Sequence, residues 1–346
     1  MKAYEMRVMI YMLGILIFLG LAEGVAYGQK KSIFDRLQAL EAPVELEIKA
    51  DLAALEDQRN TNEYVPAVLS FQLEKKVTAH WNIELRSRGK YRRRICVFPP
   101  LKVKFPKAEL KAQGYNSDNE FKLVTHCVDG EVGKEYIVRE YLVYKLFEQV
   151  SPELHLKVLL ARIRYLDERT EQRVNGWGIL VEDEKALERR FGGKVCDSCF
   201  ALQPAAYVAD NLRLVYLFQY LIGNTDWNPN SMHNVLLLRS KETGKAVLVP
   251  YDFDFSGVVN ATYAVPNVSL GQRNVRDRLF MSTLISDREL EPTKEWLRAR
   301  RSELEEMVRS LKWLSATSKT DILDYLESFY TALDGGLRRV SVPKEE

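Results

Sequence analysis

Two polar segments that each follow an apolar run constrain this chain most. Residues 223–234 (GNTDWNPNSMHN) follow the apolar run 215–222 and hold four asparagines. Residues 250–254 (PYDFD) follow the apolar run 246–249. The apolar residues 235–238 lie between the two segments and are typical of a strand. The pattern therefore predicts a helix, a loop, a strand, a turn and a second strand.

This unit is expected to bring acidic and amide side chains together. Asp226 and Asn234 lie in the loop, Asp252 ends the second strand, and Asp254 lies two residues further along, on the same face of an extended segment. Carboxylates that meet repel one another unless a cation neutralises them. Carboxylate and amide oxygens suit Mg²⁺ or Mn²⁺. The sequence therefore predicts a divalent metal site. The alternative is that the aspartates only cap a helix and shape a turn.

The N-terminus has the pattern of a secretory signal over residues 1–28. Lys2 and Arg7 precede an apolar run over 8–22, and the small-residue pattern Ala-Tyr-Gly occupies 26–28. The apolar run is shorter than the roughly 20 residues of a membrane-spanning helix. We expect a cleaved signal, and hence an exported protein of a bacterial periplasm or cell envelope. An uncleaved anchor is the alternative.

The cysteine pattern is compatible with export. All four cysteines lie beyond the signal, at positions 96, 127, 196 and 199. An even number permits disulfides in an oxidising compartment, and four cysteines allow three pairings. Cys196 and Cys199 fit a local bridge, half of a zinc site or a redox pair. Zinc requires two further ligands, and no second CxxC or HxxxH occurs in the sequence, so we favour a surface loop that is stapled or simply carries two thiols.

Other classes of protein are excluded or disfavoured. The net charge is +2, and no stacking motif accompanies the basic run 86–94, so nucleic-acid binding is not expected. The sequence contains no GxSxG, the nucleophile motif of many hydrolases. The four histidines form no HxH or HExxH pattern. We therefore interpret His233, next to Asn234, as a structural residue.

Strands dominate the first half of the chain and helices the second. Alternating and β-branched patterns predict, after a polar, helix-like lead-in over 32–55, strands over 64–73, 77–86, 101–105, 120–127, 156–166 and 173–182. Apolar spacing of three and four residues predicts helices over 134–150, 205–222, 291–311 and 319–333. A strand-rich half followed by a helical half indicates an α+β protein. We place its two parts at residues 29–183 and 184–346.

The order of these motifs resembles the spore-coat-protein-H (CotH) kinase-like family, particularly its exported bacterial members. The local marks are GNTDW…N before an apolar strand and the PYDFD turn. RSRGKYRRR before LKVKF, VREYLVYKLF and GWGILVED extend the resemblance over residues 86–255. The resemblance implies a two-lobed protein-kinase-like fold, with a β-rich N-lobe and a helical C-lobe.

The resemblance also implies roles for the acidic and amide residues. Asp226 would be the catalytic base or would orient the nucleophile, and Asp252, with Asn234 as its partner, would bind the metal ion. Asp254 would be a second ligand or a structural residue. Asn234 lies eight residues after Asp226, a longer spacing than in related kinases. Either residues are inserted in this loop, or Asn230 or Asn228 takes the place of Asn234.

The nucleotide would be held by basic residues of the first half. The resemblance implies that Lys104, or else Lys102, pairs with the phosphates, and that Glu140 holds this lysine. The glycine turn at Arg88, Gly89 and Lys90 would cover the phosphates, because a glycine lets backbone N–H groups approach an anion. The alternatives are a solvated strand face or a partner surface for the basic run, and an ordinary exposed position for Glu140.

The implied activity is that of an exported atypical protein kinase, which transfers a phosphoryl group from Mg²⁺- or Mn²⁺-bound ATP to a protein hydroxyl. A bacterial envelope holds little ATP, so two alternatives stay open. The first is a catalytically silent, pseudokinase-like module that binds a partner in the envelope. The second is a nucleotidyl or other group transferase that uses the same site.

Overall fold

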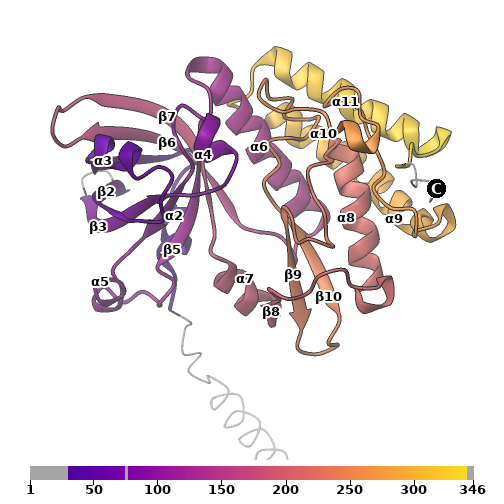
Figure 1. Cartoon of the computed structure of the whole chain (residues 1–346), viewed down its shortest axis with the longest axis horizontal. Coiled ribbons are helices and arrows are strands. Elements are labelled where there is room, and N and C mark those ends of the chain that lie inside the picture. Colours follow the sequence, from indigo (N-terminus) through magenta and orange to yellow (C-terminus); the bar gives the residue numbers. More distant parts are fainter. Residues whose placement is uncertain (1–29, 75–76, 341–346) are drawn as a thin grey trace, which may run out of the picture.

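The computed structural model describes residues 30–74 and 77–340. The expected signal over residues 1–28 lies outside this part of the chain. Within it, a β-barrel lies beside a group of helices with a small sheet, and the long helix α6 (Gly130–Val150) lies between them (Figure 1). None of the helices described has both the length and the hydrophobicity needed to cross a membrane.

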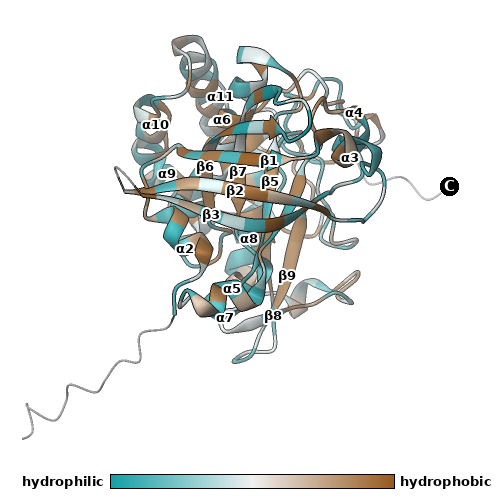
Figure 2. Ribbon diagram, turned by 90° about the vertical axis from the view of Figure 1, so that its left-hand side faces the viewer, coloured by the Kyte–Doolittle hydropathy of each residue, from teal (hydrophilic) through white to brown (hydrophobic). Residues whose placement is uncertain are grey.

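The barrel has seven strands in the order β1-β2-β3-β4-β5-β7-β6. Their bounds are β1 (Val44–Ala50), β2 (Val65–Glu74), β3 (Val77–Ser87), β4 (Leu101–Lys104), β5 (Glu120–Thr125), β6 (Val158–Asp167) and β7 (Arg173–Val181). Hydrophobic and hydrophilic residues alternate along these strands (Figure 2). The alternation places apolar side chains inside the barrel, where Trp81 packs edge-on against Phe105.

The closed barrel shows that the expected two-lobed protein-kinase-like fold, with a β-rich N-lobe and a helical C-lobe, is wrong. Strand β1 pairs antiparallel with β2 and parallel with β6, and this second pairing closes the sheet. The segment of β1 lies within the polar, helix-like lead-in expected over 32–55, so that expectation is wrong for residues 44–50. Its charged residues Glu45, Glu47 and Lys49 alternate with buried ones, so the segment is polar in composition but strand-like in period.

The other predicted strands of the barrel are confirmed. The hairpin of β2 and β3 forms with Leu69 opposite Trp81. Helix α2 (Ile33–Gln38) precedes β1, and three short helices lie in connections of the barrel: α3 (Leu52–Asp57), α4 (Arg92–Ile95) and α5 (Lys107–Ala112). Helix α4 follows β3, and it lies at the side of the barrel that faces α6 (Figure 1).

The second part of the chain is mainly helical. Its elements are α7 (Glu184–Phe191), β8 (Gly193–Val195), η1 (Pro204–Ala206), α8 (Ala209–Ile222), β9 (Val235–Ser240), β10 (Ala246–Pro250), η2 (Val268–Leu270), α9 (Asp287–Ala299), α10 (Arg301–Ser310) and α11 (Ala316–Gly335). Strands β10, β9 and β8 form a separate antiparallel sheet. The helix expected over 291–311 is divided at Arg300 into α9 and α10.

Helix α6 joins the two parts through its packing. It lies against β6 and β7 of the barrel on one side and against α10 on the other. Its apolar residues, among them Leu142, Leu146 and Phe147, belong to the same hydrophobic core as α8, β9 and β10. Consequently, a side chain that points from α6 towards α4 lies where the two parts of the molecule meet.

Candidate functional site

The hairpin of β9 and β10 brings the second polar segment beside the first. Val235 lies opposite Pro250, and the Tyr251 N–H donates a hydrogen bond of 3.1 Å to the Asn234 carbonyl just beyond that pair. Asn234 and Asp252 therefore lie at the same end of the hairpin. Both have left-handed backbone conformations, with φ of 51° and 62°. Asn and Asp adopt such conformations more readily than other residues with a Cβ, and left-handed residues of this kind cluster at functional sites.

Asp226 is held by the other end of its own loop. His233 Nε2 lies 2.9 Å from Asp226 Oδ1, and Asn234 Nδ2 donates hydrogen bonds to Asp226 Oδ2 (3.0 Å) and to the Asp226 carbonyl (2.7 Å). The hydrogen bond to Asp226 raises the pKa of His233, and the Asp252 carboxylate raises it further. Asp226 and Asp252 thus both stabilise the charged form of one imidazole, whereas the group of close carboxylates in the described residues does not include Asp226. His233 therefore connects the two ends of this loop through its contact with Asp226, and it belongs to the candidate site.

Three carboxylates form a compact cluster where the barrel meets the helical part. Oxygen atoms of Glu140, Asp252 and Asp254 lie within 4.8 Å of one another. Glu140 comes from the middle of α6, while the two aspartates follow β10. Glu140 and Asp254 are 1% and 3% exposed. By contrast, the Asp252 side chain is 33% exposed, so the cluster opens to solvent on that side.

Arg92 of α4 is the cation at the centre of this cluster. Its Nε donates a hydrogen bond of 2.6 Å to Asp254, and one Nη donates a bond of 2.8 Å to Glu140. The same Nη lies 3.5 Å from Asp252. One guanidinium compensates one of three carboxylates, so two negative charges stay without a partner if all three ionise.

The protonation of the cluster reflects this shortage of positive charge. Burial raises the pKa of Glu140 to about 8 and that of Asp254 to about 6, although Arg92 opposes both shifts. Glu140 Oε1 is buried and has no hydrogen-bond partner within the described part of the chain. A buried carboxylate oxygen without a donor, beside two further carboxylates, fits an oxygen-liganded divalent cation such as Mg²⁺ or Mn²⁺.

The lysines expected at the phosphates do not reach this cluster. Lys104 is bonded to Glu84 and Lys102 to Glu120, both on the barrel surface. The expected ion pair between one of these lysines and Glu140 is therefore wrong, and Arg92 takes that place. The sequence contains no signal that distinguishes Arg92 from its neighbours in the run 92–94.

The glycine turn before α4 lies near the site. Gly89 has a φ of 83°, which permits the turn between Arg88 and Lys90. The Lys90 ammonium lowers the pKa of His233, and the Arg88 guanidinium opposes the rise in the pKa of Tyr251 that burial causes. Lys90 therefore adds positive charge in the neighbourhood of His233, and Arg88 in the neighbourhood of Tyr251.

Two disulfides are present in the described residues. Cys196 is bonded to Cys199, which confirms the local bridge among the alternatives for that pair. Cys96 is bonded to Cys127. Cys96 directly follows α4 and Cys127 lies just before α6, so this bond ties the segment that carries Arg92 to the helix that carries Glu140.

Comparisons with known proteins give only distant likenesses among solved structures. No protein-family model matches the chain, and no curated protein shows significant similarity to it. Among solved structures, it is similar to the crystal structure of a Helicobacter pylori proinflammatory kinase, CtkA, with a TM-score of 0.38 and 11% identity. The match covers 66% of this chain and 90% of that chain. A likeness this distant carries no argument about activity, and membership of the CotH family stays a prediction.

Proposed function

We propose that this chain transfers a phosphoryl group from a Mg²⁺- or Mn²⁺-bound nucleotide, such as ATP, to a protein hydroxyl. The observation that supports the proposal most is the acid cluster of Glu140, Asp252 and Asp254, in which a single guanidinium faces three carboxylates. Asp226 is not a member of this cluster, but its carboxylate is close enough to oppose the ionisation of Asp254. Phosphoryl transfer needs little more than such positioned charges, because its catalysis is mostly orientation and charge neutralisation.

The roles follow from the exposure of each group. Asp252, with Asp254 behind it and Asn234 beside it, would hold the metal ion, which neutralises charge on the transferred phosphate. Asp226, whose side chain is 38% exposed, would accept the proton of the substrate hydroxyl and orient it. Glu140 and Arg92 would keep the aspartates in place from the buried side.

The phosphates would lie towards the glycine turn. Arg88 and Lys90 flank Gly89 and add positive charge near Tyr251 and His233. Backbone N–H groups at such a turn approach anions closely. Lys102 and Lys104 take no part, because their ammonium groups are bonded to Glu120 and Glu84.

A labelled-nucleotide assay tests the proposal. We expect Mn²⁺-dependent transfer from γ-labelled ATP to the protein itself or to an added protein acceptor. Asp226→Ala and Asp252→Ala are each expected to lower it by about 100-fold or more, the cost of losing a positioned catalytic group. Asp210→Ala is the matched control, because Asp210 is an exposed aspartate at the start of α8. Transfer that survives both site variants contradicts the proposal.

A catalytically silent binding module is the second candidate, and one observation favours it. Arg92 already places a positive charge between the carboxylates, so the cluster is partly neutralised without a metal ion. Thermal unfolding separates the candidates, since a ligand bound only to the folded chain raises the melting temperature. A rise with Mn²⁺ and ATP, lost in Asp252→Ala, supports the transferase. No rise and no transfer of γ- or α-label supports the silent module, whereas transfer of α-label alone indicates nucleotidyl transfer.

The cellular location is proposed from the N-terminal sequence pattern alone. We propose that the protein is exported and acts on a protein acceptor, or on another partner, in the bacterial periplasm or envelope. Fractionation of cells that produce the full chain checks this. Recovery of the protein only in the cytoplasmic fraction would contradict export.

A further inference from the structure

Asp226 lines a cavity of about 290 Å³ together with Thr225, Phe255 and residues 265–269. Val265 and Val268 are 62% and 76% exposed, although both are apolar. Asp226 is the one charged side chain in this lining. The cavity therefore offers an apolar surface beside the carboxylate that is proposed to accept the proton of the substrate hydroxyl.

The wall of this cavity is held in place by Gln272, a buried amide that is 3% exposed. Its Oε1 accepts a hydrogen bond of 3.0 Å from the Thr225 hydroxyl and one of 2.7 Å from the Asn267 N–H. Its Nε2 donates hydrogen bonds to two backbone carbonyls. This one side chain joins the loop of Asp226 to the segment 265–269, so the exposed valines have a fixed position beside that loop.

The aromatic part of the cavity wall continues onto helix α4. The Phe255 ring packs edge-on against the Tyr91 ring, with centroids 5.5 Å apart. Tyr91 directly precedes α4, and Arg94 and Ile95 lie three and four residues further on, which places all three on one face of a helix. This face is exposed, whereas Arg92 points the other way and is buried. A basic and apolar surface therefore adjoins the cavity through Tyr91.

The charge of this surface is not compensated by acids. Residues 86–97 hold six basic side chains and no acidic one. Within the described chain, Arg92 alone of these six pairs with a carboxylate. Burial lowers the pKa of Arg93, and the positive charges of Arg86 and Arg88 lower it further. Like charges thus lie close together here with no described carboxylate to offset them.

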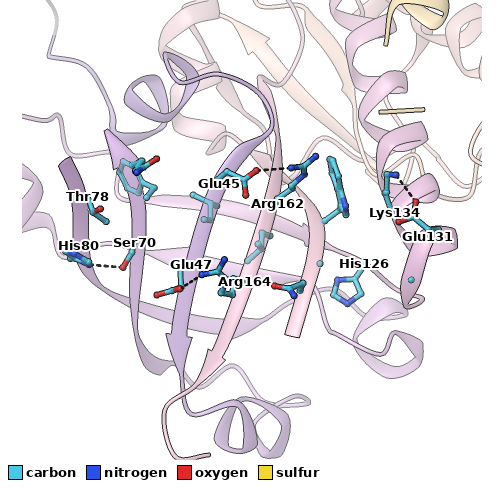
Figure 3. Close-up of a pocket in the computed structure, with 18 residues that line it drawn as sticks. Glu45, Glu47, Ser70, Thr78, His80, His126, Glu131, Lys134, Arg162 and Arg164 are labelled. Atoms are coloured by element: carbon cyan, nitrogen blue, oxygen red, sulfur yellow. Dashed lines mark hydrogen bonds and ion pairs between the residues drawn. The ribbon is translucent and has the colours of Figure 1, made fainter. Parts of the chain in front are cut away.

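Surface arginines on the outer face of the barrel, by contrast, are paired. Figure 3 shows Arg162 at Glu45 and Arg164 at Glu47. Basic groups that lack such partners attract negatively charged groups and favour partners of opposite charge. The segment 86–97 is therefore complementary in charge to an anionic partner.

The backbone of this segment is fixed before any partner binds. Arg59 donates hydrogen bonds to the carbonyls of Arg93, Cys96 and Val97. Cys96 is also bonded to Cys127 through the disulfide. Binding to a fixed surface avoids the entropy cost of ordering a loop. The exposed side chains of α4 are therefore presented in a defined arrangement.

An acidic protein segment fits this surface better than an anionic membrane does. The Asp226 carboxylate lies in the cavity and repels lipid phosphates that approach it. A protein segment, however, can place an apolar side chain and a neutral hydroxyl in the cavity and its carboxylates further away, at α4. The combination of an apolar cavity and a basic rim therefore favours a protein over a lipid surface.

We propose that the cavity beside Asp226 and the exposed face of α4 together dock an acidic segment of the acceptor protein. An apolar side chain of that segment packs against Val268, and its carboxylates bind at Arg94. Arg88 and Lys90 stay available to the nucleotide phosphates. This inference rests on the proposed phosphoryl transfer, because it names the class of acceptor for that reaction.

Fluorescence anisotropy of labelled peptides tests the docking surface without nucleotide. The probes are a fluorescein-labelled peptide in which four glutamates precede Leu-Ser-Leu, and a counterpart in which lysines replace the glutamates. We expect the full chain to bind the glutamate peptide saturably and about tenfold or more tightly than the lysine peptide, and added salt to weaken this binding. Vesicles of phosphatidylglycerol are the third probe.

Two exposed positions carry the test, so that loss of folding does not confuse it. Arg94→Glu is expected to weaken binding of the glutamate peptide by about tenfold or more. Lys241→Glu, the same charge change in the turn between β9 and β10, is its matched control. Val268→Ser is expected to weaken binding by about threefold or more, since it removes apolar contact. Val174→Ser, at an exposed position of β7, is the matched control.

The outcomes separate this inference from the proposed activity. Tighter binding of the lysine peptide, binding to the vesicles alone, or equal losses in variants and controls overturns the acidic docking surface. Transfer to both peptides without preference also overturns it, while the phosphoryl transfer stands. Binding of the glutamate peptide that Arg94→Glu weakens, with no transfer from ATP, supports the docking surface and contradicts the transfer.

Discussion

Arg92 donates a hydrogen bond of 2.8 Å to Glu140 across the boundary between the barrel and the helical part. Arg92 comes from the barrel connection α4, and Glu140 from α6. The same guanidinium is bonded to Asp254, which follows the hairpin of β9 and β10. One barrel residue therefore organises carboxylates that two other segments supply, and the geometry of the acid cluster depends on how the barrel sits against α6.

Arg92→Met is expected to destabilise the fold strongly. It removes the only positive charge in direct contact with the described acid cluster and leaves buried carboxylates unpaired, which typically costs about 3–5 kcal/mol. Urea unfolding at pH 7.5 measures the loss, and Mn²⁺ is expected to restore part of it. Arg94→Met is the control, because Arg94 is exposed on the same short helix. Equal losses in the two variants would contradict the central role of Arg92.

The fold is expected to become less stable as the pH rises, because the buried Glu140 carboxyl then loses its proton. Burial raises its pKa from 4.5 to about 8, so the folded chain holds a proton that the unfolded chain has already released between these values. Stability is therefore greatest below pH 4.5 as far as this group is concerned, and its contribution falls as the pH rises to 8. Asp254, with a pKa raised to about 6, adds to the fall at lower pH.

Unfolding free energies between pH 5 and 8 measure this slope. Glu140→Gln is expected to flatten it, whereas Glu131→Gln, an exposed glutamate of the same helix, is expected to leave it unchanged. Mn²⁺ binding is expected to release protons and to strengthen as the pH rises, because the metal ion and the proton compete for the same oxygens. A slope that is identical in Glu140→Gln would show that other groups cause it.

Local patterns predicted most of the strands because their evidence is local. The alternation in the segments of β2, β3 and β4 depends on which side chains face the core, and this is visible residue by residue. The positions of Asp226, Asn234 and Asp252 followed in the same way. Each lies at the end of an apolar element, and the hairpin of β9 and β10 needs only a short connection.

Barrel closure and the partner of Glu140 could not be predicted in this way. Closure depends on the parallel pairing of β1 with β6, whose residues Val44 and Ala161 are far apart in sequence. The choice of Arg92 over Lys102 or Lys104 depends on the path of the chain between β3 and β4. The spacing of apolar residues does not predict the path of this connection. The positive charge of the run 86–94 is equally compatible with several carboxylates as ion-pair partners.

Removal of the Cys96–Cys127 disulfide is expected to loosen the acid cluster. This bond closes a loop of 31 residues and ties α4 to the start of α6, so replacing both cysteines by serine should cost about 2–5 kcal/mol. The same change at Cys196 and Cys199, which are three residues apart, is the control and should cost less. Thermal unfolding and Mn²⁺ titration of both variants check this. Weaker Mn²⁺ binding in the control alone would contradict the proposed link.

Gly223→Ala is expected to disturb the loop of Asp226 more than its backbone conformation alone explains. Gly223 has a φ of 64° at the end of α8, and a Cβ there would lie 1.9 Å from the Tyr325 hydroxyl, which donates a hydrogen bond to the Arg276 carbonyl. Gly244 has a similar φ of 67°, but no described atom lies within 4 Å of a Cβ there. Gly244→Ala should therefore cost only the backbone strain of about 1 kcal/mol.

The comparison of these two variants separates strain from collision. Urea unfolding should show a larger loss for Gly223→Ala than for Gly244→Ala, because Tyr325 must give up its hydrogen bond or the turn must move. Because Asp226 lies three residues further on, a shift of about 1 Å in the turn should lower transfer activity by about 100-fold. Equal losses of stability, with full activity in both variants, would show that Tyr325 yields freely and that the turn does not position Asp226.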